Sequence, residues 1–425
     1  MKTEYTLPSE TLPSLDMQSH FDDIECFIEF LNKRKIKTKN TRIERYLSYL
    51  KEVIDNNSKI IEINDIKKIF PLSHDNRFRT PLDYHMYVLR EIHELMWIYN
   101  GIKDNVPKGI DEKLKFIIGG KDFAALDSST NSRNTQFELR IASYFCKYDC
   151  LVDLSTETDI IAHTKKQSFY IECKRVGNIK KLSERISEAR NQLKSRMPKK
   201  IFGKDIYGCI AIDITKIAFA HNGLTFAKTN EHSKDIIQNK LLTTFSMIEN
   251  KVSENFDKNK NLCSVWLQIH IPSLITYPAN TITRFSSYHY NRGDLNGKQK
   301  RAFTIFKELF ESASDEIDER VIKPKKLEFQ NKLVIPKGTI YSLNMELFEE
   351  FLLKDDITSI KNSDIVGSIN INNKLDEFNL LELLETLNSL TKKELKEYKD
   401  NIIFARLKIL MDMYVKRYPY KEIQS

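Results

Sequence analysis

Several motifs that identify common protein classes are missing from this sequence of 425 residues. It contains no P-loop, no GxGxxG and no GxSxG, so ATP hydrolysis, Rossmann-type cofactor binding and α/β-hydrolase chemistry have no support. No apolar run approaches the roughly 18–20 residues that cross a bilayer. The N-terminal residues MKTEYTLPSETLPSLDMQ lack the apolar segment of a secretion signal. We therefore expect a soluble, cytoplasmic protein with no membrane partner.

Cysteine and glycine are both sparse. The six cysteines include no CxxC pair and no Cys/His series with the spacing of zinc ligands. This pattern favours reduced thiols in the core over disulfides or a zinc site. Twelve glycines in the whole chain favour helices joined by few open loops.

Positive charge is concentrated in one stretch of the chain. The net charge of +8 is modest for this length, but residues 174–204 hold eleven Lys or Arg against two acids. Such a local excess suits a polyanionic partner, because neutralised phosphates release their counterions. A solvated helix face is the plain alternative.

The order of the expected elements divides the chain into three domains. Helical periodicity over 1–118 predicts a helical N-terminal domain. Residues 291–425 turn polar and then helical, which predicts a mostly helical C-terminal accessory domain. Between them, 119–290 has the order of an α/β (α+β) core with a mixed central sheet. Its expected elements are a helix over 135–147, strands over 150–154, 159–163 and 168–174, a helix over 179–196, and strands over 207–214 and 263–271.

The residues most suited to chemistry lie in the stretch ETDIIAHTKKQSFYIECKRV, residues 157–176. Side chains alternate along a strand, so Glu172 and Lys174 project from the same face. A turn at TKKQ pairs the two strands antiparallel and brings Asp159 toward the strand end that carries Glu172 and Lys174. Carboxylates are hard oxygen ligands for Mg²⁺ or Mn²⁺, and an ammonium beside them stabilises charge that develops on a phosphate. The stretch predicts a metal site for phosphodiester hydrolysis.

Two helices flank this stretch. In the first, Glu138 shares a face with apolar side chains, which is costly unless a metal site or a core arginine pairs with it. The second, over 179–196, has an apolar stripe at Leu182, Ile186, Ala189 and Leu193. About a right angle away, a polar face suited to a backbone phosphate holds Lys181, Arg185, Gln192 and Arg196.

This arrangement resembles the PD-(D/E)xK nuclease superfamily, which has the restriction-endonuclease-like fold. The resemblance covers roughly residues 120–275 and rests on TQFELRIASYF, TDII, IECK and Gln192. Thr158 stands where a proline usually precedes the first acid, a position that varies in the superfamily. The resemblance implies an α-β-β-β-α-β core and a catalytic set of Glu138, Asp159, Glu172, Lys174 and Gln192. It also implies Mg²⁺ or Mn²⁺ held by Glu138, Asp159, Glu172 and the main-chain carbonyl of Cys173.

The sequence therefore predicts a metal-dependent nuclease, with DNA favoured over RNA, of a restriction or defence type. We expect the nucleic acid to contact Arg175, Lys181, Arg185 and Arg196. A homodimer or a regulatory protein partner fits this activity, because cutting a duplex needs two sites or two events. A non-catalytic nucleic-acid-binding or assembly subunit with the same fold is the alternative, and an RNA-directed nuclease is a third hypothesis. The aromatic residues Phe285, Tyr288 and Tyr290 either stack on bases or cover a core edge.

Overall fold

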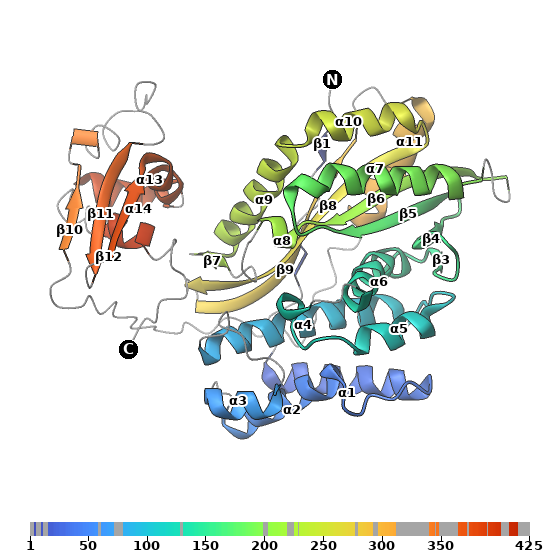
Figure 1. Cartoon of the computed structure of the whole chain (residues 1–425), viewed down its shortest axis with the longest axis horizontal. Coiled ribbons are helices and arrows are strands. Elements are labelled where there is room, and N and C mark those ends of the chain that lie inside the picture. The colour runs from blue at the N-terminus through green and yellow to red at the C-terminus, as the bar shows by residue number, and fades with distance from the viewer. Residues whose placement is uncertain are drawn as a thin grey trace. The chain divides into compact units, whose positions relative to one another are not determined.

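The computed structural model describes most of residues 16–311, part of 340–414, and the short segments 4–5 and 10–11. Within these ranges it leaves out 58–60, 72–79, 128–130, 199–202, 219–224, 228, 277–278, 292–295, 345, 348–363, 372–373, 389 and 401–407. The chain divides into two compact units (Figure 1). The first is Met1–Thr225, Ser233–Ile275 and Asn280–Lys325, and the second is Phe226–His232, Thr276–Ala279 and Lys326–Ser425.

Amphipathic helices fill the N-terminal part of the first unit. They are α1 (Met17–Lys33), α2 (Arg42–Asp55), α3 (Ile63–Ile69), α4 (Pro81–Ile102) and α5 (Ile110–Ile118). The apolar side chains of α1 recur every three or four residues and are buried at Ile24, Phe27 and Leu31. The longest of these helices, α4, begins with a capping box in which Thr80 and Asp83 each accept a hydrogen bond from the other's N–H. Nearly all of its side chains are buried.

The described strands of the first unit build a nine-stranded mixed sheet in the order β1-β9-β8-β6-β5-β4-β3, with β2 paired to β9 and β7 to β8. Strands β3, β4 and β5 are antiparallel neighbours, whereas β5, β6 and β8 run parallel. The strands are β1 (Glu4–Tyr5), β2 (Glu10–Thr11), β3 (Leu151–Asp153), β4 (Ile160–His163), β5 (Gln167–Arg175), β6 (Asp205–Asp213), β7 (Thr225–Ala227), β8 (Leu262–Thr276) and β9 (Ala279–Tyr290).

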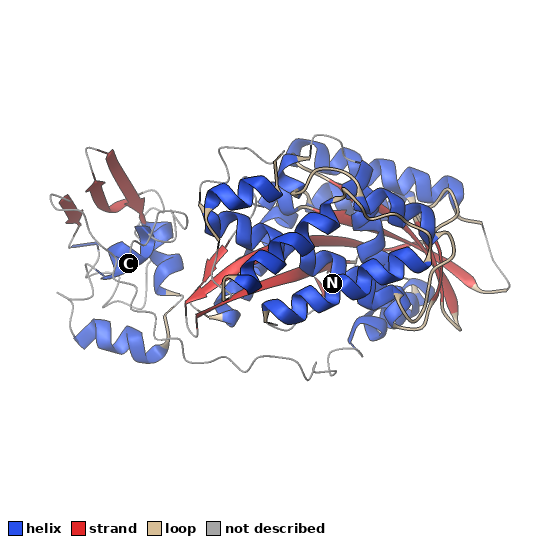
Figure 2. Cartoon of the chain, turned by 90° about the horizontal axis from the view of Figure 1, so that it is seen from below, coloured by secondary structure: helices blue, strands red, loops and turns tan. Residues whose placement is uncertain are grey.

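Helices cover both faces of this sheet (Figures 1 and 2). One apolar cluster joins the sheet to α7 (Ile179–Arg196), α9 (Asn230–Ser246) and α10 (Glu249–Lys258). The other joins it to the N-terminal helices, to α6 (Asn131–Lys147) and to α11 (Gly297–Glu311). A short helix, α8 (Thr215–Ala218), follows β6. The mixed α/β fold with a mixed sheet is thus confirmed, and no helix in the described part of the chain is long and apolar enough to cross a membrane.

The helices over 1–118 pack directly against this core. Their apolar side chains belong to the same buried cluster as those of α6 and the sheet. This cluster includes Phe27 of α1 and Trp266 of β8. At Gly101 of α4, an added Cβ would lie 2.5 Å from the Cβ of Ser143 in α6, so glycine permits the close approach of these helices. The division of the chain into domains at 118 and 290 stays a prediction.

The described part of the second unit contains strands as well as helices, and the mostly helical character of 291–425 stays a prediction. The described elements are β10 (Ile340–Leu343), β11 (Ile365–Ile371) and β12 (Lys374–Asn379) in one antiparallel sheet, with α13 (Leu380–Leu387) and α14 (Lys392–Asp400). A register shift between Ile365 and Gly367 breaks the alternation in β11, and Val366 and Ile369, three residues apart, are both fully buried. This irregular spacing hides the two-residue period of a strand.

Candidate active site

The hairpin of β4 and β5 sets the position of Asp159. Its register pairs Ile160 with Ile171, so Asp159 lies beside the next residues of β5. The Oδ2 atom of Asp159 accepts a hydrogen bond from the N–H of Cys173 at 2.7 Å. Because the N–H and C=O of one strand residue point to the same side, the carbonyl of Cys173 also points toward Asp159.

Glu172 is a fully buried acid with spare hydrogen-bonding capacity. Its Oε1 accepts a hydrogen bond from Arg196 Nη1 at 2.8 Å, and Lys174 Nζ lies 3.9 Å from its Oε2. The described residues offer Oε2 no hydrogen bond, although this atom is buried. Burial and the nearby Asp159 raise the pKa of Glu172 to about 7, against the opposing effect of Arg196 and Lys174.

Glu138 reaches the same region from α6. Burial and Asp159 raise its pKa, whereas Lys113 and Lys174 lower it, so this carboxyl group lies within electrostatic reach of the site. Its partner in the described chain is Lys113 of α5, whose Nζ is 2.5 Å from Glu138 Oε2. Lys113 was not predicted, although it lies on the same stripe of α5 as the buried Ile110 and Ile117.

Helix α7 contributes an amide and several cations. The Oε1 atom of Gln192 is buried and has no hydrogen-bond partner among the described residues. Lys181 and Arg185 are exposed, and Arg185 pairs with Glu188 at 2.6 Å. Arg196 is engaged with Glu172. Arg175 projects from the opposite face of β5 to Lys174 and pairs with Asp213 at 3.3 Å. Of the four cations predicted to contact nucleic acid, Lys181 and Arg185 are at the surface, where Arg185 has an exposed ion pair. Arg175 and Arg196 are paired with buried acids.

The site brings together three acids, each with a partner from the chain. Glu138 is held by Lys113, Asp159 by the N–H of Cys173, and Glu172 by Arg196. Among the residues that the structure describes, no group of three or more His, Cys, Asp or Glu side chains is arranged to hold a metal ion. In this arrangement, positively charged side chains pair with two of the three carboxylates, Glu138 and Glu172.

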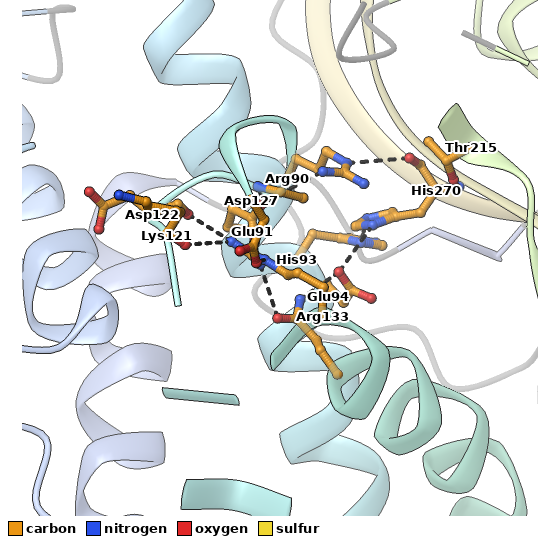
Figure 3. Close-up of polar contacts among 12 residues, drawn as sticks. Arg90, Glu91, His93, Glu94, Lys121, Asp122, Asp127, Arg133, Thr215 and His270 are labelled. Carbon is orange, nitrogen blue, oxygen red and sulfur yellow. Dashed lines mark hydrogen bonds and ion pairs between the residues drawn. The ribbon is translucent and has the colours of Figure 1, made fainter. Parts of the chain in front are cut away.

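A buried ionic network that no sequence motif indicated lies between α4, α6 and the sheet (Figure 3). Glu91 of α4 pairs with Arg133 and Arg42, and Glu94 pairs with Arg140 at 2.7 Å. The same arginine lies 3.4 Å from Asp213, which also holds Arg175. Further members are His93 and His270, whose ring nitrogens are 3.1 Å apart. The network therefore connects α4 to Arg175, the residue that follows Lys174 in β5.

Electrostatics hold the network in one charge state. Although burial alone would raise the pKa of Asp213, Arg140 and Arg175 lower it to about 2. Burial lowers the pKa of His270 to about 4, which keeps its ring neutral near pH 7. Buried charges are stable only when they are paired in this way.

The aromatic residues considered for base stacking belong to the core. Phe285, Tyr288 and Tyr290 lie in β9 and are each at most 1% exposed. Phe285 packs on His93 and His270, and both tyrosines pack on Phe245. The structure favours the core interpretation of these residues, because buried rings are not available to bases. All six cysteines are unpaired and five are buried, but Cys26 is exposed and so is not the core thiol that was expected.

Comparison with known proteins supplies no further guide. No protein-family model, no curated protein and no solved structure matches the chain.

Proposed function

We propose that this protein is a metal-dependent nuclease that hydrolyses phosphodiester bonds, with DNA as its substrate. The observation that carries the proposal is the buried Glu172, whose Oε2 has no hydrogen bond within the described structure and lies 3.9 Å from Lys174. A buried carboxylate oxygen without a partner is costly, so it calls for a ligand that the protein acquires. Asp159 lies close enough to raise the pKa of this carboxyl group.

The order of the elements around these residues supports a restriction-endonuclease-like core. Helix α6 is followed by β3, β4 and β5, then by α7 and β6, which is the α-β-β-β-α-β order that the resemblance implies. Asp159 precedes β4, Glu172 and Lys174 lie near the end of β5, and Gln192 lies in α7.

The donors fit Mg²⁺ or Mn²⁺. The residues that would hold the ion are Asp159, Glu172 and the carbonyl of Cys173, all hard oxygen donors. When bound, the ion lowers the pKa of a water molecule and offsets negative charge on the phosphate.

The protein's own cations complete the site. The Lys174 ammonium would hold the attacking water or the charge that develops on the phosphate. The exposed Lys181 and Arg185 of α7 would bind phosphates that flank the cleaved bond. Such contacts fix the position of the DNA strand and do not depend on the DNA sequence. The orphaned Gln192 carbonyl is an acceptor suited to the attacking water.

A non-catalytic binding subunit is the second candidate. The observation that favours it is that Lys113 and Arg196 already neutralise two of the acids. Such a subunit would bind nucleic acid through the surface of α7 and would leave cleavage to another protein.

We expect Mg²⁺ or Mn²⁺ to support cleavage of DNA and EDTA to stop it. Plasmid, linear duplex, single-stranded DNA and RNA are compared for the wild type, Lys174→Met and Lys166→Met. Lys174→Met should slow cleavage about 10²–10³-fold, because it removes charge stabilisation at the phosphate. Lys166 lies exposed in the turn between β4 and β5, so its substitution should leave the rate within about two-fold.

The outcomes of this comparison separate the candidates. Cleavage of RNA alone would make the protein an RNA-directed nuclease. DNA binding without cleavage of any substrate, with either metal, would favour the binding subunit.

A further inference from the structure

The ion pair between Lys113 and Glu138 joins two helices at the edge of the proposed metal site. The Nζ of Lys113 is 2.5 Å from Oε2 of Glu138, and the two side chains are 24% and 13% exposed. They come from α5 and α6, so the packing of these helices fixes their approach. A partly buried ion pair this close is screened little by solvent.

Glu138 is the one acid of the three that is not assigned to the proposed ion, so a second ion at this site would use its carboxylate. It lies within electrostatic reach of both Asp159 and Lys174. A second divalent ion at Glu138 would have to displace the Lys113 ammonium and would then lie close to it. The Lys113 ammonium therefore already occupies the Glu138 carboxylate.

We propose that Lys113 substitutes for a second metal ion, so that the site binds one divalent ion and Glu138 is reserved for Lys113. This inference rests on the proposed function. In nucleases that use two metal ions, the second ion stabilises the leaving oxygen of the phosphodiester. A lysine ammonium is a compact point charge that supplies positive potential without demanding a fixed coordination geometry. Lys113 is a positioning residue in this account, because it acts through Glu138.

The number of bound ions tests the inference. Mn²⁺ binding to the full chain is measured by calorimetry and by electron paramagnetic resonance. The wild type should bind one ion and Lys113→Met two, because the variant frees the Glu138 carboxylate. The double variant with Lys113→Met and Glu138→Gln should return to one ion.

Lys115 supplies the matched control, since it lies on the same helix, is exposed, and pairs with Glu112 alone in the described structure. Lys115→Met should bind one ion with unchanged affinity. Glu138→Gln alone should bind one ion three- to ten-fold more weakly, because the Lys113 ammonium then lacks its counter-charge. This second variant keeps the test decisive if Lys113→Met does not fold.

The possible failures are distinguishable. Two ions in the wild type, or one ion of unchanged affinity in both Lys113→Met and Glu138→Gln, would overturn the role of Lys113. The proposed function would still hold after such an outcome if Asp159→Asn abolished both Mn²⁺ binding and cleavage. A wild type that binds no Mn²⁺ and cuts nothing would overturn both.

Discussion

Replacing Arg140 by methionine is expected to lower the free energy of unfolding by about 3–5 kcal/mol, the cost of removing one partner from a buried ion pair. Arg140 is 0% exposed and bridges Glu94 and Asp213, so its loss leaves two buried carboxylates short of positive charge. Urea denaturation at pH 7 measures the change. Arg185→Met is the control, because its exposed ion pair with Glu188 contributes at most about 1 kcal/mol.

The loss of stability caused by Arg140→Met should become smaller as pH falls. The pKa of Asp213 is about 2 in the folded protein and about 3.9 in an unfolded chain. Its ion pairs therefore stabilise the fold fully above pH 4, and this contribution is lost as pH falls through 2. The difference between wild type and Arg140→Met should shrink from pH 7 to pH 3. An equal difference at both values would show that Arg140 acts through packing alone.

Replacing Glu172 by glutamine is expected to reduce metal-dependent cleavage by about 10³-fold or more, because an amide is a poor ligand for Mg²⁺. The same variant should be more stable than the wild type above pH 7. The pKa of Glu172 is about 7 in the folded protein, whereas an unfolded glutamate has a pKa near 4.3. Ionisation of Glu172 thus costs folding free energy as pH rises from about 4.3 through 7.

Glutamine avoids that cost, so Glu172→Gln should gain about 1–3 kcal/mol of stability at pH 8 and little below pH 5. The measurements are cleavage rate and urea denaturation at both pH values. Lost activity with gained stability is the pattern of a residue kept for function. If Glu172→Gln lost stability at pH 8 instead, the carboxylate would be a structural partner of Arg196.

Local periodicity was sufficient to predict the elements around the site. Helix α7 covers 179–196 as expected, because its apolar stripe at Leu182, Ile186 and Leu193 is regular and fully buried. The β4–β5 hairpin also follows from its pattern, since a polar turn separates two apolar runs. These features depend on residues close together in the chain.

The buried network was not predictable, because its ion pairs join residues far apart in sequence. Glu91 and Arg133 are 42 residues apart, and Glu94 and Arg140 are 46 apart. A charged residue in isolation indicates exposure, and only its partner allows it to be buried. The helix predicted over 135–147 in fact begins at Asn131, and its added first turn carries Arg133 of the network.

The N-terminal helices contribute more to the site than a separate accessory domain would. Lys113 of α5 holds Glu138, and Glu94 of α4 is linked through Arg140 and Asp213 to Arg175. Both connections depend on helices that pack on the core through shared apolar side chains. Changes in these helices should therefore alter the geometry of the β5 strand end.

The most direct measurement of the central claim is the rate at which the purified protein nicks supercoiled plasmid as Mg²⁺ is added, for the wild type and for Asp159→Asn. We expect a rate that rises with Mg²⁺, falls to zero with EDTA, and drops about 10³-fold in Asp159→Asn. Asparagine keeps the size of the side chain and an oxygen that can accept the Cys173 N–H, so the fold should be retained. Equal nicking by both proteins, or no nicking by a wild type that still binds the plasmid, would show that Asp159 does not support metal-dependent cleavage.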